Sequence, residues 1–432
     1  MMNLKTTYTI ADKSTLDSVT ADVNKMIEVA DEYIAETPTG PYKDVVRYGI
    51  KIKKSDSNPA TRMTYTYDAV GMTPAKMNYT TGAFDYGDWA KVWFIKKNKP
   101  VMLKSDGTED YELDPSDYSK KADGSSSDYN NINYNGNVMA RIPLVYVSMS
   151  QDSNYEYITI SNKKFDDTYK AIAHTKSDGS IVDNIYLACF KGNVHSSKAR
   201  SISGRIDKDA YTISQWTDYA TNNGTGWNIG TWGQRMLINS LLWIIGRSDD
   251  TQTTFGRGNA SSYSDSTSTG GGNSSYEYMI ATGNLYNKGQ FFGYNDNYHQ
   301  VKIFHIEGWW GDRWNFIHGL MCVSGVVKVS LIGPYNYTGS GYTTVSGPYT
   351  SGGGYTSTTM TNEYGRFATA VGGGETTYTC DYYYCQSDTS NTYFAYVGGN
   401  CGNGAYCGAS FVVVSRSASY SYWSVGASLS FV

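Results

Sequence analysis

The sequence predicts an α+β protein in three parts: a short N-terminal helix at residues 1–41, a β-rich domain with a linker at 42–137, and a C-terminal domain at 138–432. Three observations predict this organisation. Apolar residues near the N-terminus recur at heptad spacing. Short segments from residue 42 onward alternate apolar and polar residues, as half-buried strands do. Residues 232–245 carry the apolar period of a helix, and Gly246 fits its C-terminal cap.

The N-terminal segment has the pattern of a helix with a defined start and end. Ser14 and Asp17 resemble a capping box, and the run from Thr37 to Pro41 stops the pattern. The apolar positions follow one another at steps of three and four: Leu16, Val19, Val23, Met26, Ala30 and Tyr33. A short coiled coil that assembles subunits explains this seam. An amphipathic helix packed on its own domain explains it equally well, because the seam spans fewer than three heptads.

The remaining chain alternates between predicted strands and polar stretches. Residues 46–52 read as a strand, residues 91–103 as a hairpin around a turn at 97–99, and residues 119–137 as a linker. Residues 142–147 and 155–160 read as paired strands. Residues 333–359 consist almost entirely of Gly, Ser, Thr, Tyr and Pro, so we expect an exposed insertion there.

The composition favours recognition through aromatic contacts. Charged residues make up only 18% of the 432 residues, while Tyr (40) and Gly (45) are abundant. Tyrosine offers a rigid apolar ring and a hydroxyl at low entropic cost, although it also simply fills strands well. The net charge of −4 argues against nucleic-acid binding. Neither a membrane-spanning apolar run nor a signal peptide is visible, so no membrane insertion is expected.

The cysteines do not predict a metal site. Four of the six lie near the C-terminus, with four residues between Cys380 and Cys385 and five between Cys401 and Cys407. These spacings differ from the CxxC pairs of zinc sites, and the histidines do not cluster near them. Disulfides within these two pairs are conceivable in an oxidising compartment, whereas free thiols are the default for a chain made in the cytosol.

The strongest local motif is the run from His305 to Trp314, HIEGWWGDRW. Three tryptophans around a glycine form an aromatic knot that can pin a long loop onto a domain with little regular structure. An exposed platform for sugars is the alternative, but large aromatic rings more often contribute to a core. Structural roles are therefore predicted for Trp309, Trp310, Trp314 and, near the C-terminus, Trp423.

Residues 138–432 resemble the C-type lectin fold as it occurs in formylglycine-generating-enzyme-like domains and phage variable tropism proteins. The resemblance is carried by the strand pair at 142–160, Gly226-Trp227 before the 232–245 helix, the FGRG run at 255–258, the EGWWGDRW run, and the final residues 423–432. Calcium-dependent lectins read sugars through motifs that are not matched here, and the catalytic cysteine pattern of the formylglycine enzymes is also missing. The resemblance therefore implies a binding scaffold without cofactors.

What the resemblance implies is a bacteriophage adhesin on the virion surface that binds a host-cell receptor, either a glycan or a protein, through its last strands and loops. By analogy with viral fibres, the N-terminal helix would form a homotrimer, and other virion proteins would be partners. Some positions in such proteins are diversified through reverse transcription, and Cys401 and Cys407 fit such surface positions. The candidate ligand-binding residues are Tyr382, Tyr383, Tyr384, Tyr393, Asn400, Asn403, Tyr406, Arg416, Tyr420 and Tyr422.

Two other functions are weighed against the adhesin. A structural fibre or decoration protein without a specific ligand explains a Tyr- and Gly-rich chain equally well. A carbohydrate depolymerase would need two carboxylates at a defined separation, and the sequence fixes no such pair. The candidate acids and bases are Glu307, Asp312, His318, Asp381 and Asp388. Since hydrolase, P-loop and zinc-protease motifs are also missing, an enzyme is not expected.

Overall fold

The computed structural model describes residues 23, 44–206, 210–261, 279–386 and 388–432. The predicted N-terminal helix and its coiled coil therefore lie outside the described residues, apart from Val23. Residues 47–432 belong to one compact unit. The predicted boundary at residue 137 falls inside a strand of this unit, and strands from both sides of that boundary share a sheet.

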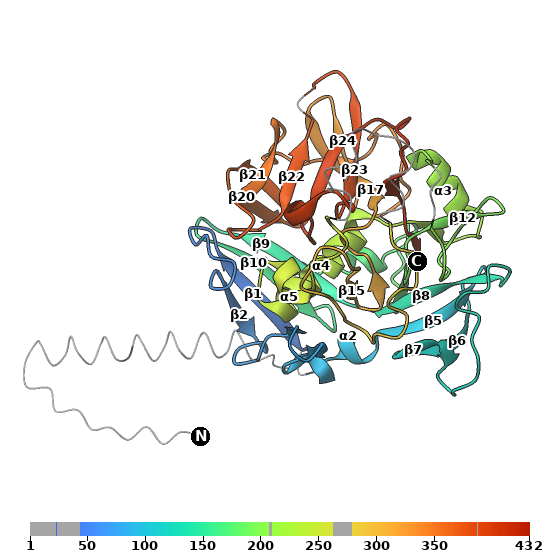
Figure 1. Ribbon diagram of the computed structural model, residues 1–432. Coiled ribbons are helices and arrows are strands. Elements are labelled where there is room, and N and C mark those ends of the chain that lie inside the picture. Colours follow the sequence, from blue (N-terminus) through green and yellow to red (C-terminus); the bar gives the residue numbers. More distant parts are fainter. Residues whose placement is uncertain (1–22, 24–43, 207–209, 262–278, 387) are drawn as a thin grey trace, which may run out of the picture. The chain divides into compact units, whose positions relative to one another are not determined.

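The described part of the chain is β-rich and contains three larger sheets (Figure 1). The four-stranded sheet has the order β2 (Met63–Tyr67), β1 (Arg47–Lys53), β10 (Tyr155–Ser161) and β9 (Tyr146–Gln151). The seven-stranded sheet has the order β14 (Trp227–Ile229), β26 (Leu429–Phe431), β11 (Asn184–Ala188), β8 (Gly136–Pro143), β5 (Lys99–Lys104), β6 (Glu109–Asp114) and β7 (Asp117–Lys121).

The nine-stranded sheet is built from the last third of the chain. Its order is β19 (Thr343–Thr344), β18 (Val326–Val329), β17 (Trp314–Val323), β23 (Thr392–Val397), β24 (Val412–Arg416), β22 (Tyr382–Cys385), β20 (Gly352–Asn362) and β21 (Gly365–Val371), with β25 (Val425–Gly426) paired to β17. Three two-stranded ribbons complete the β-structure: β3 (Lys76–Asn78) with β4 (Ala83–Asp85), β12 (Asn193–His195) with β13 (Lys198–Arg200), and β15 (Lys302–Ile303) with β16 (Ile306–Glu307).

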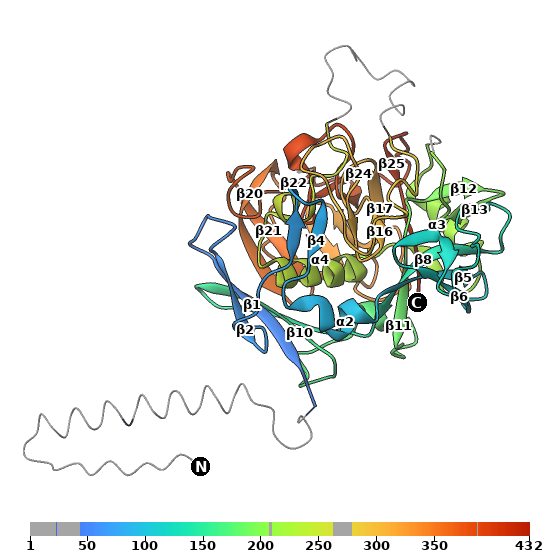
Figure 2. The same cartoon turned by 60° about the horizontal axis from the view of Figure 1, so that its bottom comes forward.

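Helix α4 (Trp232–Gly246) runs through the middle of this unit, between the four-stranded and the nine-stranded sheets (Figure 2). A capping box starts it, because the Thr231 hydroxyl accepts from the Gln234 amide and the Gln234 side chain accepts from the Thr231 amide. All fifteen of its residues are buried. The prediction of a helix over 232–245 is thus confirmed, with Arg247 in the left-handed conformation as the cap residue in place of Gly246.

The other helical segments are short. They are α2 (Trp93–Lys96), α3 (Ile213–Thr221), α5 (Thr251–Phe255) and the 3-10 turns η2 (Trp89–Lys91), η3 (Ile172–His174) and η5 (Gly404–Tyr406). Two predictions of secondary structure from the sequence are wrong. Residues 89–96 are helical turns, so only the second arm of the predicted 91–103 hairpin is a strand. Residues 352–359 of the predicted insertion belong to β20, a strand inside the nine-stranded sheet.

A buried ionic network ties the four-stranded and nine-stranded sheets together beside α4. The Arg366 guanidinium, on β21, donates to Glu156 of β10 at 2.8 Å and also binds Asp249, which precedes α5. Arg62 forms a second ion pair with Asp249 at 3.1 Å. The side chains of all four residues are at most 2% exposed. Since each charge has an opposite partner, the cost of burying it is largely offset.

Candidate functional site

The candidate ligand-binding residues concentrate on the nine-stranded sheet, whose two faces have different neighbours. Strand alternation sends Tyr382 and Tyr384 to one face and Tyr383 to the other. Tyr383 is 7% exposed and belongs to the core cluster that contains α4. We call the face that carries Tyr382 and Tyr384 the outer face of this sheet. Tyr383 therefore does not contribute to an accessible tyrosine surface, contrary to the sequence prediction.

The outer face carries a cluster of three tyrosine rings, Tyr355, Tyr382 and Tyr406, which we call the Tyr406 cluster. The ring centroids of Tyr382 and Tyr406 lie 4.4 Å apart, and Tyr355 lies 5.3 Å from Tyr406 and 5.8 Å from Tyr382. Phe411 supports Tyr382 at 5.9 Å. Tyr406 is 41% exposed. The cluster thus holds its rings by mutual contact and leaves part of their surface open.

Gly353 makes room for this arrangement. It pairs with Tyr384 across β20 and β22. A Cβ atom there would lie 2.5 Å from Cδ2 of Tyr384 and 3.0 Å from Cε1 of Tyr382, which is too close for any side chain. The neighbouring rings therefore lie over the glycine backbone. Tyr355, two residues later, is a member of the cluster that the sequence analysis missed, because residues 333–359 were interpreted as an insertion.

The loop that carries Tyr406 is shaped by glycines and by its own asparagines. Gly399 has a φ of +84°, and a Cβ there would lie 2.4 Å from the Cys407 sulfur. The Asn403 side chain accepts from the Asn400 amide at 2.8 Å, and the Asn400 side chain accepts from the Gly402 amide at 3.0 Å. Asn400 and Asn403, both predicted to bind ligand, thus use side-chain oxygens to build the turn.

A second aromatic group on the outer face involves Arg416, Tyr420 and Tyr422, which we call the Arg416 cluster. The Arg416 guanidinium lies 4.4 Å from the Tyr420 ring centroid, and the rings of Tyr420 and Tyr422 stack at 6.4 Å. Burial raises the pKa of Tyr420 and of Tyr382, so both phenols stay protonated hydrogen-bond donors at neutral pH. Tyr384 pairs with Val413, which pairs with Tyr396, and these residues lie between the two clusters.

Tyr393 lies apart from both clusters. It pairs with Cys322 on the opposite face of the sheet and packs against the α4 side of the core. Its hydroxyl donates to Asp388 at 2.9 Å, which also accepts from Asn391. The sheet therefore brings together Tyr382, Tyr384, Tyr406, Arg416, Tyr420 and Tyr422, and separates Tyr383 and Tyr393 from them.

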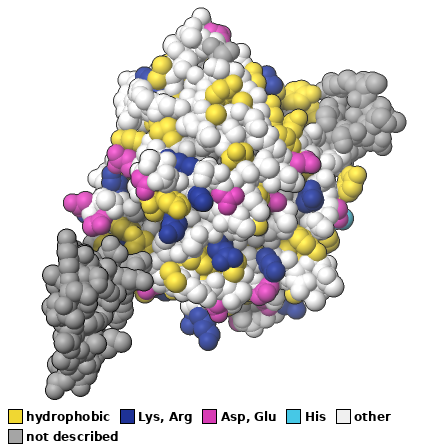
Figure 3. All heavy atoms as spheres, turned by 90° about the vertical axis from the view of Figure 1, so that its left-hand side faces the viewer, with side chains coloured by type: hydrophobic (Ala, Val, Ile, Leu, Met, Phe, Trp, Pro, Cys, Tyr) yellow, Lys and Arg dark blue, Asp and Glu magenta, His cyan; other side chains and the backbone are white. Residues whose placement is uncertain are grey.

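Charged side chains are scarce around these clusters. No lysine follows Lys328 in the sequence, and Arg366 and Arg416 are the arginines after it. Figure 3 shows one side of the molecule, with charged side chains mainly across its middle and lower parts and mostly uncharged atoms towards the top. A surface of this kind contacts ligands through rings, hydroxyls and backbone groups rather than through ion pairs.

The tryptophans named in the sequence analysis lie beneath this surface. Trp310 is fully buried and donates to the Gly256 carbonyl at 3.0 Å, and Trp309 donates to Asn239 of α4 at 2.9 Å. Trp314 packs edge-on against Tyr396 at 4.7 Å. Trp423 packs with Met279 and Cys401 in a small separate cluster.

The two carboxylates of the same motif, Glu307 and Asp312, accept hydrogen bonds from the backbone of a loop. Glu307 accepts from the amides of Gly283 and Leu285 at 2.8 and 2.9 Å, and Asp312 accepts from the Ile280 amide at 2.8 Å. Burial raises the pKa of Glu307 to about 7. Both side chains are 3% exposed or less. The sequence predicted that the tryptophan rings of this motif pin a long loop, whereas the contacts to residues 280–285 come from its two carboxylates.

The other candidate acids and bases are also engaged locally. Asp381 is 2% exposed and accepts from the Ser410 amide at 2.6 Å, and burial raises its pKa well above the usual range. His318 is buried, and its Nε2 lies 2.9 Å from the Thr217 hydroxyl. Asp388 lies on a turn and holds Tyr393. The geometry assigns each of these groups a structural partner.

All six cysteines are buried free thiols. The interpretation of Cys401 and Cys407 as surface positions is therefore wrong, since both are fully buried. Small, buried thiols are good core residues, and the tight turn around Gly399 leaves room for little else.

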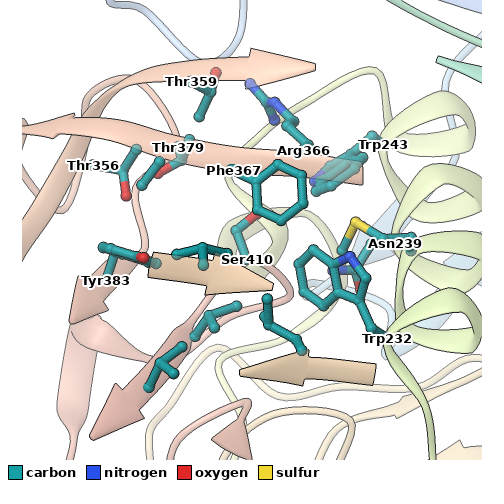
Figure 4. A pocket seen from close by; sticks show the side chains of 16 residues that line it. Trp232, Asn239, Trp243, Thr356, Thr359, Arg366, Phe367, Thr379, Tyr383 and Ser410 are labelled. Carbon is teal, nitrogen blue, oxygen red and sulfur yellow. The ribbon is translucent and has the colours of Figure 1, made fainter. Parts of the chain in front are cut away.

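A cavity of about 40 Å³ lies on the inner side of the sheet, between β20, β21, β22 and β24 and helix α4 (Figure 4). Tyr383, Thr379, Ser410 and Asn239 line it together with Trp232 and Phe367. This volume holds one or a few water molecules. Ligand pockets are usually several hundred cubic ångströms, so the cavity is a packing feature of the core.

The described residues contain no group of three or more His, Cys, Asp or Glu side chains placed to hold a metal ion. In the same part of the chain, the helices are too short or too polar to span a bilayer. No model of a known protein family matches this chain, and no curated protein matches it either.

Proposed function

We propose that this protein is a bacteriophage virion adhesin that binds a host-cell surface receptor through the outer face of its nine-stranded sheet. The observation that carries the proposal is the pairing of the Tyr406 cluster with the Arg416 cluster on one weakly charged face. The lectin-like resemblance of residues 138–432 supports it, because such scaffolds present their last strands and loops to a receptor.

The physical argument rests on rings that are held in place before a ligand arrives. Tyr382 and Tyr406 are restrained by each other and by Phe411, so little side-chain entropy is lost on binding. Each ring offers an apolar surface for stacking on a sugar or a peptide, and each hydroxyl offers a hydrogen bond. Loss of one such ring costs about 1–2 kcal/mol of binding free energy.

Oligomerisation would strengthen this binding. We propose that the heptad seam of residues 16–33 forms a trimer, so that three tyrosine faces act together. Linked sites of modest affinity gain avidity because the second and third contacts become intramolecular. A cross-linked full-length protein that migrates as a monomer would contradict this part of the proposal.

The test is adsorption of the full-length protein to intact cells of the bacterium on which the virus grows. Tyr406→Ala and Tyr382→Ala are expected to weaken adsorption about tenfold each. Tyr134→Ala is the matched control, because it removes a half-buried tyrosine that donates to Asp110 in a different sheet. Equal adsorption of all three variants and the unchanged protein would refute binding through this face. Failure of the unchanged protein to adsorb would favour a decoration protein.

Release of soluble sugars from the host surface by the purified protein would indicate the third function, a depolymerase. Glu307→Gln and Asp381→Asn would then be the variants to compare. Both side chains are buried and bound to backbone amides, so the proposal expects no such release.

A further inference from the structure

A groove with a volume of about 530 Å³ lies over the four-stranded sheet, on the side that faces away from α4. Its walls come from the sheet, from residues 166–170 and from Glu363 at the turn between β20 and β21. A volume of several hundred cubic ångströms is typical of small-molecule sites. The groove lies outside the tyrosine clusters, and none of the ten candidate ligand-binding residues lines it.

The floor of the groove is rich in hydroxyl groups. Alternation sends Ser148 and Ser150 of β9 to the same side as Tyr157 and Thr159 of β10, with which they pair. Gly49 on β1 has no side chain, so nothing projects from this adjoining position of the sheet into the groove. A Cβ there would lie 2.5 and 2.8 Å from the hydroxyl oxygens of Thr66 and Thr159, so a larger residue does not fit.

An aromatic ring projects from this floor in a fixed position. The Tyr157 hydroxyl donates to Asp152 at 2.7 Å, and the ring lies 6.3 Å from that of Tyr155. On the opposite wall, Tyr67 adopts a positive φ of 56° and packs over the Arg47 guanidinium at 4.2 Å. The groove therefore combines a restrained ring with hydroxyl donors and acceptors.

The charges around the groove compensate one another. Lys170 pairs with Glu363, and Asp167 pairs with Lys164 at 2.6 Å. Asp166 accepts from the amide and the hydroxyl of Thr168 at 2.7 and 2.6 Å. The Arg47 guanidinium lies between the rings of Tyr67 and Phe165, at 4.2 and 4.0 Å. An anionic ligand would meet three carboxylates, and an apolar ligand would desolvate many hydroxyls.

We propose that this groove binds a neutral saccharide of one or two sugar rings. A sugar ring has an apolar face that stacks on Tyr157, and its hydroxyls exchange hydrogen bonds with Ser148, Ser150 and Asp166. An uncharged polyhydroxylated ligand matches a lining in which Lys170, Glu363 and Asp167 are already ion-paired and Asp166 offers a hydrogen-bond acceptor. The site is independent of the tyrosine face, so the chain has two recognition surfaces on different sheets.

The test uses the full-length protein and a panel of neutral disaccharides built from glucose, galactose, mannose and N-acetylhexosamine, with a sialylated and a sulfated disaccharide for comparison. Saturation-transfer NMR detects binding, and calorimetric titration gives the affinity. At least one neutral member is expected to bind with a millimolar or lower Kd, more tightly than either anionic one.

Three substitutions then locate the site. Tyr157→Ala is expected to weaken binding at least about tenfold, because the stacking ring is lost. Tyr157→Phe is expected to keep binding within about threefold, because the hydroxyl already serves Asp152. Ser150→Trp, at an exposed position on the floor, is expected to abolish binding by filling the groove. Circular dichroism and thermal melts confirm that each variant is folded.

Tyr406→Ala separates this proposal from the adhesin proposal. Saccharide binding that survives Tyr406→Ala and is lost in Ser150→Trp supports the groove. Binding that is lost in Tyr406→Ala and kept in Ser150→Trp overturns the groove and places the sugar on the tyrosine face. The proposal is also overturned if no neutral disaccharide binds at millimolar concentration, or if an anionic one binds more tightly.

Discussion

The two faces of the nine-stranded sheet use the same residue type for opposite purposes. On the inner face, Tyr383 fills space against α4 and is 7% exposed. On the outer face, Tyr382 and Tyr384 remain half-buried, and Tyr382 joins a cluster that includes the exposed Tyr406. The difference follows from strand alternation alone. Tyrosine content therefore says little about recognition until the face of each residue is known.

The inner face should be the more sensitive to substitution, and its ionic network should show the largest effect. Arg366→Met leaves Glu156 and Asp249 buried with less compensation, so we expect a loss of about 3–5 kcal/mol in the free energy of unfolding. Urea denaturation measures it. The control is Arg416→Met at the exposed end of β24, expected to change stability by no more than about 0.5 kcal/mol. Similar losses for both variants would contradict the comparison.

Within one strand, the contrast between faces can be measured directly. Tyr383→Ala enlarges the cavity beside α4, and we expect it to lower the free energy of unfolding by about 3–4 kcal/mol. Tyr384→Ala removes a half-buried ring from the outer face, with an expected loss of about 1 kcal/mol. Urea denaturation of the two variants provides the test. A larger loss for Tyr384→Ala would mean that the outer face is packed as tightly as the inner one.

The pH should change stability through buried histidines without changing the tyrosine face. Burial lowers the pKa of His174 and of His318 to about 4. In the unfolded chain histidine titrates near 6.5, so the unfolded state binds more protons as the pH falls from about 6.5 towards 4. Folding stability is therefore complete above this window and is lost within it, by about 3 kcal/mol for each histidine.

The measurement compares urea denaturation at pH 7 and pH 4.5 for the unchanged protein and for His318→Gln. The variant is expected to lose the share of the pH dependence that His318 contributes, although its stability at pH 7 is lower. An unchanged pH dependence in His318→Gln would show that this histidine is not the proton acceptor. Carboxylates titrate equally in both proteins, so the difference isolates the histidine.

Some features could be predicted from the sequence because they depend on local patterns. The apolar period of residues 232–245 predicted a helix, and α4 is that helix; the capping box of Thr231 and Gln234 that starts it was not part of the prediction. The tryptophans of the HIEGWWGDRW run were expected to pin a long loop, and the run does hold residues 280–285, but through Glu307 and Asp312. Prediction from the sequence failed where pairing between distant segments decides the secondary structure. Residues 352–359 carry few apolar side chains, yet they belong to β20: residues 352–355 pair with β22, where Gly353 leaves room for the Tyr382 and Tyr384 rings, and the following residues pair with β21.

The residues of the candidate site could also be predicted only in part from the sequence. Tyr382 and Tyr406 were named from the resemblance to phage variable tropism proteins, but period-two alternation within the YYYC run already predicts that Tyr383 points away from its neighbours. Tyr355 could be found by sequence only if β20 were known to pair with β22. The groove over the four-stranded sheet had no sequence signature, because its lining comes from six separate segments.

The sharpest test of the outer face is Gly353→Ala. The added methyl group would lie 2.5 and 3.0 Å from atoms of the Tyr384 and Tyr382 rings and 2.7 Å from the Tyr383 carbonyl oxygen, so the rings and the strand must shift, and we expect a loss of about 1–3 kcal/mol in stability. Displacing Tyr382 also separates it from Tyr406, so adsorption to host cells should fall although no tyrosine is removed. Gly124→Ala is a control for glycine replacement, since no atom lies within 4 Å of a Cβ there and its amide donates to the carbonyl of Lys121 at the end of β7, in a different sheet. Its own backbone has a positive φ of 85°, so it loses stability through strain without contacting the tyrosine clusters. If the two variants adsorb equally well, the placement of the Tyr382 ring against the Tyr406 ring does not affect binding, and each tyrosine of the outer face contributes independently.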